Sequence, residues 1–230
     1  MQIKRDWPIS FDAERFVAVQ GESLGRLLQN PARLEAFHQA LEEVQAAVQP
    51  AACWDRFPVQ RLTHEKVVLA DGTRLGGGPV VRVVGGAEEL VVAVCTVGHG
   101  VDRLVEAAQR EQQLFKAMLL SDMGSWGVDQ VRQGLCRWLE VEAQRQGRRV
   151  SAPLSPGESD WAVTDQASIF ALLDAAQINV WLSPSMVMSP IKSLSMIMGV
   201  GSRPMGVEGA SNCDFCSLQE RCRYRTLRVA

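Results

Sequence analysis

Three cysteines near the C-terminal end have the spacing of a metal site. In the stretch CDFCSLQERC, two residues separate Cys213 from Cys216, and Cys222 follows six positions later. A tight turn in a C-x2-C sequence points both sulfurs at one ion, and a third cysteine nearby adds a third ligand. The stretch therefore predicts an iron–sulfur cluster or, alternatively, a zinc site. A redox-active thiol pair and inert thiols are the remaining alternatives.

Both kinds of metal centre usually take four protein ligands, so these three cysteines form an incomplete set. Within the chain, Cys53, Cys95, Cys136 and Asp214 are candidates for the fourth ligand. A residue of a partner or a small molecule is the other possibility. Cys95 and Cys136 lie in apolar sequences, where a free cysteine usually packs as a small hydrophobic residue, so we interpret these two as core residues.

The composition and charge of the chain argue against nucleic acid and membranes as partners. The chain has 230 residues, a formal net charge of −2 and a pI near 6.0. It therefore lacks the overall positive charge of a duplex-binding protein. The first sixteen residues contain no apolar stretch long enough for a signal peptide, and no run in the sequence approaches the roughly 20 apolar residues that a membrane span needs. We expect a cytoplasmic protein that binds neither nucleic acid nor membrane, and in that reducing compartment clustered cysteines more often bind metal than form disulfides.

The first half of the chain predicts a helix, a hairpin and a strand–helix unit. Apolar residues at three- and four-residue spacing predict an amphipathic helix over 31–48. β-Branched residues on both sides of Asp71-Gly72 indicate a hairpin. The apolar run 89–98 predicts a buried strand, and a helix is expected to begin near Gly100.

The second half predicts a long central helix and the loops around it. This helix covers 113–147, and the Pro-, Ser- and Gly-rich stretch 148–161 is expected to be an exposed loop. A short helix should begin at Thr164 or Asp165 and end near Ala175. The segment that follows should form strand pieces interrupted at Pro184 and Pro190. No histidine or serine stands at a spacing that indicates a catalytic centre.

Two stretches of the sequence resemble a known family. AVCTVGHGVDRLVEAAQ and LSPGESDWAVTDQASIFALLDAAQINVWLSPSMVMSPIKSLSMIMG are similar to segments of the activation domain of cobalamin-dependent methionine synthase and its short stand-alone relatives. The second stretch carries a loop related to the family's SPGY-x-D/A-W, a helix ending in LLDA, and a strand with P-x-K-S. The resemblance covers residues 89–200 well and the N-terminal part loosely.

The resemblance implies an α+β fold in which helices wrap a twisted antiparallel sheet. It implies an activation-like domain over 1–200. The cysteine-rich tail over 201–230 is an addition that the methionine synthase domain does not have. It also implies S-adenosylmethionine binding beside the loop and docking on a corrinoid-binding protein or methyltransferase. The residues carried over as cofactor-binding are Ser155, Pro156, Gly157, Glu158, Trp161, Lys192 and Ser193. We expect the docking surface to comprise the loop 155–161, including Trp161 as flat apolar area, and the segment 186–195.

The chain departs from the family pattern at the loop itself. Where the family has R-x-x-P-G-Y, Pro153 stands at the arginine position and Glu158 at the tyrosine position. A proline cannot clamp a carboxylate, so the sequence predicts weak S-adenosylmethionine binding or none.

Two functions from different classes fit these features. The first is an accessory protein that reductively reactivates a cobalamin protein, with an iron–sulfur centre at the tail as electron donor. The alternative is a non-catalytic interaction module with a structural zinc and a degenerate S-adenosylmethionine pocket. A methyltransferase acting on a small substrate is a third and weaker reading.

Overall fold

The computed structural model describes residues 1–158, 161–206 and 220. Its first half contains, in chain order, β1 (Gln2–Arg5), α1 (Ala13–Gln20), α2 (Glu22–Leu27), α3 (Pro31–Ala47), β2 (Ala51–Leu62), β3 (Val67–Leu69), β4 (Arg74–Leu75), α4 (Val80–Val83) and β5 (Glu89–Thr96). The second half contains α5 (Gly100–Arg110), α6 (Leu114–Arg145), β6 (Arg149–Val150), the 3₁₀ turn η1 (Val163–Asp165), α7 (Gln166–Leu172), the 3₁₀ turn η2 (Ala175–Ile178), β7 (Trp181–Leu182), β8 (Met188–Ser189) and β9 (Ser193–Gly201).

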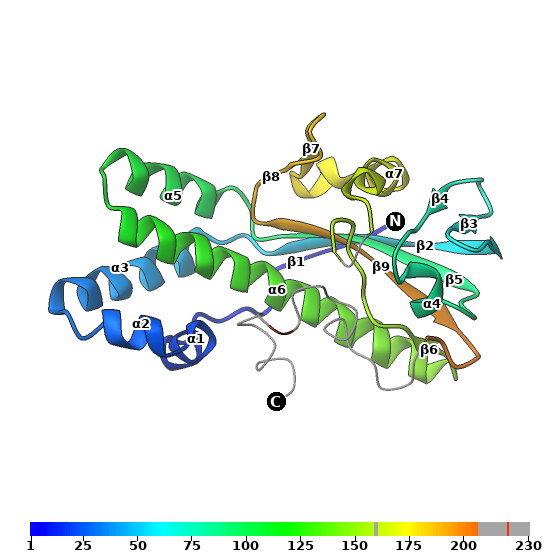
Figure 1. The fold of residues 1–230 in the computed structure, drawn as a ribbon, viewed down its shortest axis with the longest axis horizontal. Coiled ribbons are helices and arrows are strands. Elements are labelled where there is room, and N and C mark those ends of the chain that lie inside the picture. The colour runs from blue at the N-terminus through cyan, green and yellow to red at the C-terminus, as the bar shows by residue number, and fades with distance from the viewer. Residues whose placement is uncertain (159–160, 207–219, 221–230) are drawn as a thin grey trace.

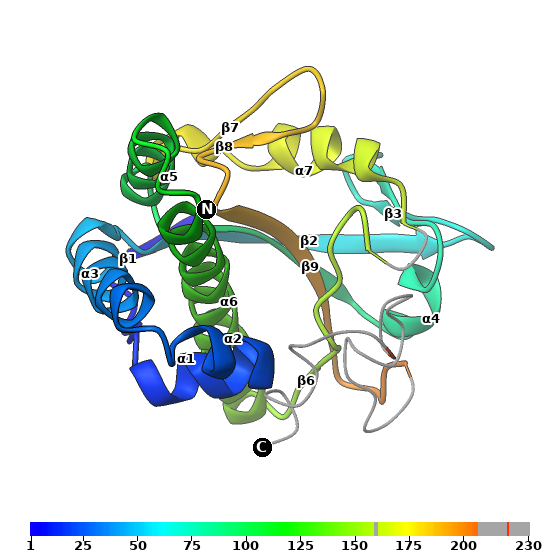
Figure 2. The same ribbon diagram turned by 60° about the vertical axis from the view of Figure 1, so that its left-hand side comes forward.

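An antiparallel sheet forms the centre of the fold. Among the described residues it has seven strands in the order β4-β3-β2-β5-β9-β6, with β1 also paired to β2. Strands β2, β5 and β9 form its long central part, and β9 curves strongly where it crosses the sheet (Figure 2). Helices α1, α2, α3, α5 and α6 lie on one side, and α7 lies on the other (Figure 1). The predicted α+β fold with a helix-wrapped antiparallel sheet is confirmed.

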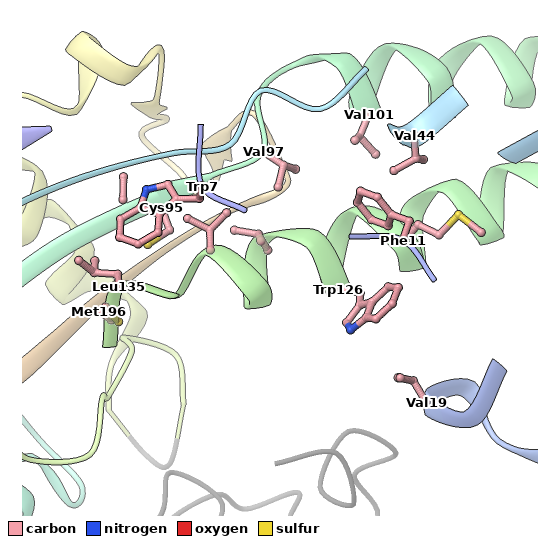
Figure 3. Close-up of a cluster of buried hydrophobic side chains, with 14 of the residues drawn as sticks. Trp7, Phe11, Val19, Val44, Cys95, Val97, Val101, Trp126, Leu135 and Met196 are labelled. Atoms are coloured by element: carbon pink, nitrogen blue, oxygen red, sulfur yellow. The ribbon is translucent and has the colours of Figure 1, made fainter. Parts of the chain in front are cut away.

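Strand alternation builds a hydrophobic core on each face of the sheet. On β5, Val91, Ala93 and Cys95 pack toward the five helices, whereas Val92 and Val94 pack toward α7. The core on the helix side contains several aromatic side chains, including Trp7, Phe11 and Trp126 (Figure 3). Because both faces of the sheet are covered at β5, the sequence of this strand is a continuous apolar run.

The predicted elements follow their local sequence signals. Helix α3 begins as expected because the Asn30 side chain accepts from the backbone N–H groups of Ala32 and Arg33, and Pro31 occupies the first turn. The hairpin of β3 and β4 turns at Gly72, whose φ of 88° suits glycine. The segment after Asn179 forms β7, β8 and β9, with Pro184 and Pro190 between them as predicted.

The long helix α6 crosses the whole molecule. Its 32 residues span about 48 Å at 1.5 Å per residue. A Cβ atom at Gly124 would lie 2.7 Å from Val101 Cγ1 of α5, so this glycine lets the two helices approach closely. Among the helices of the described residues, none combines the length and hydrophobicity that a bilayer crossing requires.

Candidate functional site

A cavity of about 380 Å³ lies where β9 faces helix α6 and the loop after β6. Its polar side chains come from the middle of α6, from residues 155–158, from the start of α7 and from β9. Its apolar walls are Trp126, Met188 and Leu194. A concave site with apolar walls and a few converging polar groups is typical of a small-molecule site.

Helix α6 supplies a polar stripe to the cavity. Ser125, Asp129 and Arg132 stand four and then three residues apart, so they share one face of the helix. Arg132 is only 5% exposed and donates to the carboxylate of Asp129, which also accepts from Gln133 Nε2 at 2.8 Å. The cavity therefore has a buried guanidinium in its wall.

The charge of Arg132 is maintained by its neighbours. Burial alone would lower the pKa of the guanidinium, but the nearby Asp129, Cys136 and Glu158 raise this pKa above its ordinary value. Arg132 thus stays charged in the cavity wall. The described lining residues carry one positive group, Arg132, and two carboxylates, Asp129 and Glu158, so their formal charge is −1.

The loop wall is held by backbone hydrogen bonds to Trp161. The N–H of Gly157 donates to the carbonyl of Trp161 at 2.8 Å, and the N–H of Trp161 donates to the carbonyl of Glu158 at 2.9 Å. Gly157 has a φ of 90°, a conformation that side chains rarely adopt, so the Pro-Gly sequence is needed for the turn itself.

Trp161 anchors this loop to the rest of the fold. Its indole Nε1 donates to Asp165 Oδ2 at 2.8 Å, and the same carboxylate oxygen accepts from Gly76 N at 2.9 Å and from Lys66 Nζ at 3.3 Å. The ring is 2% exposed and packs in the core on the α7 side of the sheet. The expectation that Trp161 offers flat surface area for docking is therefore wrong, because Asp165 satisfies its one polar group and lets the ring be buried.

The edge of strand β9 that faces away from β5 forms the floor of the cavity. Leu154 pairs with Ile197 through two backbone hydrogen bonds of 3.0 and 2.8 Å. Residues two apart on a strand direct their backbone groups to the same side, so the N–H and C=O of Ser195 face the same edge as those of Ile197. Ser195 is also one of the residues that line the cavity.

Gln166 contributes a buried polar atom without a partner. This first residue of α7 lines the cavity and is 5% exposed. Within the described part of the chain, its Oε1 has no hydrogen-bond partner. A buried acceptor without a donor costs about 1–3 kcal/mol, so a hydrogen bond from a water molecule or from a ligand in the cavity is favoured at this atom.

Lys192 and Ser193 lie next to the cavity but do not line it. Lys192 Nζ donates to Ser121 Oγ at 2.8 Å and to Ser125 Oγ at 3.1 Å, and burial lowers its pKa. Ser193 Oγ donates to Thr96 Oγ1 at 2.9 Å. Lys192 thus reaches the cavity through Ser125, and a direct cofactor contact by either residue stays a prediction.

The structure brings together four of the seven residues that the resemblance implied, namely Ser155, Pro156, Gly157 and Glu158. Sequence reasoning missed the helix wall and Gln166. The signal that could have found the wall is the stripe of Ser125, Asp129 and Arg132, which are polar positions on a helix otherwise expected to be buried.

The cysteines divide into a buried set and a set outside the described residues. Cys53 and Cys95 pack on opposite faces of the sheet, and burial raises the pKa of the Cys53 thiol to about 11 and that of Cys95 well above its ordinary value. Cys136 is half-buried, and burial raises its pKa to about 12. Protonated, buried thiols are poor metal ligands, which supports the interpretation of Cys95 and Cys136 as core residues.

The predicted metal ligands Cys213, Cys216 and Cys222 and the candidate Asp214 lie outside the described residues. Among the residues that are described, no cluster of three His, Cys, Asp or Glu side chains could hold a metal ion. The iron–sulfur and zinc alternatives, and the division of the chain at residue 200, therefore stay predictions.

Comparison with known proteins identifies the fold. No protein-family model matches the sequence, and no curated protein matches it. Among solved structures, a crystal structure of the MetH reactivation domain bound to AdoHcy is similar with a TM-score of 0.56 at 14% sequence identity. The alignment covers 90% of this chain and 75% of that chain. The chain therefore has the fold of the MetH reactivation domain, as the sequence resemblance implied.

Proposed function

We propose that this protein is an accessory factor that returns a cobalamin-binding protein to its active, methylated state with S-adenosylmethionine as methyl donor. One observation carries the proposal. In a chain with the fold of the MetH reactivation domain, the cavity forms at residues 155–158, the loop that carries the sequence resemblance. The structure with that fold is one bound to AdoHcy, the product that S-adenosylmethionine leaves after methyl transfer.

The cavity has groups that suit S-adenosylmethionine. This ligand carries a carboxylate, an ammonium and a sulfonium, and its net charge of +1 complements the formal charge of −1 of the lining side chains. Arg132 offers a guanidinium to the carboxylate, and Asp129 and Glu158 offer carboxylates to the cationic groups. Trp126, Met188 and Leu194 provide apolar surface for the flat base.

The reaction needs the methyl donor and the cobalt to meet in a fixed orientation. One electron from a separate donor first reduces cob(II)alamin to cob(I)alamin. The cobalt electron pair of cob(I)alamin then forms the bond to the methyl carbon, while the bond from this carbon to the sulfonium sulfur breaks and AdoHcy leaves. This chain's part is to bind and orient the methyl donor, since holding two reactants in register removes much of the entropic barrier. The task therefore requires no nucleophile from the protein.

We assign the partner to the face beside the cavity. The segment 186–195 contains the exposed side chains of Val187 and Ile191, and its Met188 lines the cavity. An exposed apolar segment that adjoins the cavity suits a partner that must present its cofactor there. Lys192, which adjoins Ser125, is expected to contribute to this docking.

The tail is proposed to supply the electron. Three cysteines at residues 213, 216 and 222 fit the ligation of an iron–sulfur cluster, with zinc as the alternative. An iron–sulfur centre in the same chain would serve as the one-electron donor that the reaction needs. A zinc ion cannot change its redox state and would leave the tail a structural role.

The test is an anaerobic methylation assay. A corrinoid protein loaded with cob(II)alamin is mixed with this protein, S-adenosylmethionine and a low-potential reductant, and formation of methylcobalamin is followed by its absorbance. We expect methylation that depends on both this protein and S-adenosylmethionine, and no reaction when AdoHcy replaces the methyl donor.

Metal analysis of the anaerobically purified protein separates the two functional classes. Brown protein with iron and sulfide supports the reductive factor. Colourless protein with one zinc and no acceleration of methylation would instead favour the non-catalytic interaction module.

A further inference from the structure

The cavity contains an arginine that the loop sequence lacks. Pro153 stands where the resemblance implies an arginine and is not among the residues that line the cavity, whereas Arg132 of helix α6 lines it. We propose that Arg132 binds the carboxylate of the ligand's amino-acid end, and that Gln166 accepts a hydrogen bond from an N–H or O–H group of the same ligand. This inference rests on the proposed function, because it takes S-adenosylmethionine as the ligand.

The geometry of Arg132 suits this role. Its guanidinium lies in the cavity wall, is 5% exposed, and has five N–H donors, of which the ion pair with Asp129 engages Nη2. A guanidinium removed from water binds an oxyanion more strongly than one on the surface, because the local dielectric is low. A purely structural ion pair between Asp129 and Arg132 would account for their contact, but it would not require the guanidinium to line a cavity.

Gln166 provides independent evidence for a ligand. Its Oε1 is buried without a donor among the described residues, and its side chain belongs to a different element, α7, on the other side of the cavity. Native proteins rarely leave such an acceptor unpaired, so an external donor at this position is expected. Arg132 and Gln166 together define a ligand that carries an anionic group and a hydrogen-bond donor.

The expectation of weak S-adenosylmethionine binding is revised on this basis. That expectation depended on the missing arginine at position 153, and it did not include a guanidinium supplied by a helix. In this proposal an arginine still binds the carboxylate, but the arginine belongs to helix α6 and not to the loop.

The test compares two ligands that differ only in the carboxylate. S-Adenosylmethionine and decarboxylated S-adenosylmethionine are titrated by calorimetry into the wild-type chain and into Arg132→Met and Arg132→Lys. We expect the wild type to prefer the carboxylate form by about 10- to 100-fold, as a charge-assisted contact predicts. Arg132→Met should lose this preference without weakening the binding of the decarboxylated ligand, and Arg132→Lys should retain part of it. Arg137→Met, which removes an exposed arginine of the same helix, is the matched control.

The outcomes distinguish the inference from the proposed function. An undiminished preference in Arg132→Met, or equal loss of affinity for both ligands, overturns the role of Arg132 and leaves S-adenosylmethionine as the ligand. If the wild-type chain binds neither ligand, the inference fails together with the choice of S-adenosylmethionine as methyl donor.

Gln166→Met gives a second measurement with a distinctive pattern. Removing an unpaired buried acceptor should leave the melting temperature of the ligand-free protein unchanged or raise it, while affinity for S-adenosylmethionine falls about 5- to 20-fold. A lower melting temperature with unchanged affinity would mean that Oε1 has a structural partner, and it would overturn this part of the inference.

Discussion

Replacing Asp165 by alanine should both destabilise the fold and loosen the cavity loop. One oxygen of this carboxylate accepts from Trp161 Nε1, from Gly76 N and from Lys66 Nζ, at 2.8, 2.9 and 3.3 Å. These contacts tie the segment after the cavity loop to Gly76, which follows β4, and to Lys66, which precedes β3. Asp165→Ala removes all three at once.

The magnitude follows from the burial of each donor. The indole N–H belongs to a ring that is 2% exposed, and an unpaired donor there costs about 1–3 kcal/mol. The partly buried N–H of Gly76 adds roughly 1 kcal/mol. The ion pair with the partly exposed Lys66 contributes about 0–1 kcal/mol. We therefore expect Asp165→Ala to lower the free energy of unfolding by about 2–5 kcal/mol, whereas Asp165→Asn, which keeps an acceptor oxygen, should lower it by about 1 kcal/mol.

Urea denaturation followed by tryptophan fluorescence measures these differences. Asp174→Ala is the matched control, because Asp174 is exposed and accepts one side-chain hydrogen bond, from Gln177 at 2.9 Å. Since the backbone of Trp161 bonds to Gly157 and Glu158, Asp165→Ala should also weaken ligand binding in the cavity. If Asp165→Ala unfolds within about 0.5 kcal/mol of the wild type, the carboxylate does not hold the loop and the reasoning is refuted.

Three further predictions concern packing, thiol chemistry and the tail. Gly100→Ala should destabilise the protein by about 1–3 kcal/mol or more, because its Cβ would lie 2.1 Å from the carbonyl oxygen of Ala47. Gly25→Ala, whose Cβ meets only Val17 at 4.0 Å, should stabilise it by about 0.5–1 kcal/mol; equal melting temperatures for the two variants would contradict the clash. Iodoacetamide reacts with the thiolate form of cysteine, and raising the pKa of Cys53 from 9.0 to about 11 lowers the thiolate fraction roughly 100-fold. At about pH 8, iodoacetamide should therefore leave the buried thiols unmodified until denaturant is added. Mass spectrometry checks this, and rapid modification in the folded protein would show an accessible thiol at Cys53, Cys95 or Cys136. Replacing Cys213, Cys216 or Cys222 by serine should abolish metal binding and change the melting temperature little, because a core of this size does not depend on a terminal site. A variant that keeps the wild-type metal content would show that the replaced cysteine is not a ligand.

Local patterns were sufficient for most of the fold. The continuous apolar run at β5 predicted a buried strand, and apolar residues at three- and four-residue spacing predicted the helix α3. Pro184 and Pro190 separate the last three strands because proline cannot donate to a ladder. These features depend on neighbours close in sequence, which is why the sequence alone revealed them.

Only part of the site could be predicted, because its walls come from segments that are far apart in the sequence. Residues 155–158 were visible through their turn sequence, whereas Arg132 was concealed in a helix that the apolar pattern assigned to the core. Trp161 was expected on the surface, since it is the last residue of the Pro-, Ser- and Gly-rich stretch 148–161, which was expected to be an exposed loop. Its burial depends on Asp165, and nothing in the spacing of the two residues shows that the carboxylate also reaches Gly76 and Lys66.

The two walls of the cavity differ in the number of buried contacts that must be lost before each wall can move. Arg132 is carried by a helix whose buried residues run through the main core, whereas the loop 155–158 is held by the Leu154–Ile197 bridge on one side and by the bonds to Trp161 on the other. Local openings of low free energy occur where few buried contacts are lost, so the loop should exchange its amide hydrogens much faster than the middle of α6. If the cavity binds S-adenosylmethionine as proposed, the ligand would enter and leave as this short segment opens. In the proposed function, the helix would stay fixed during this opening and would keep the ligand in a constant orientation toward the partner protein.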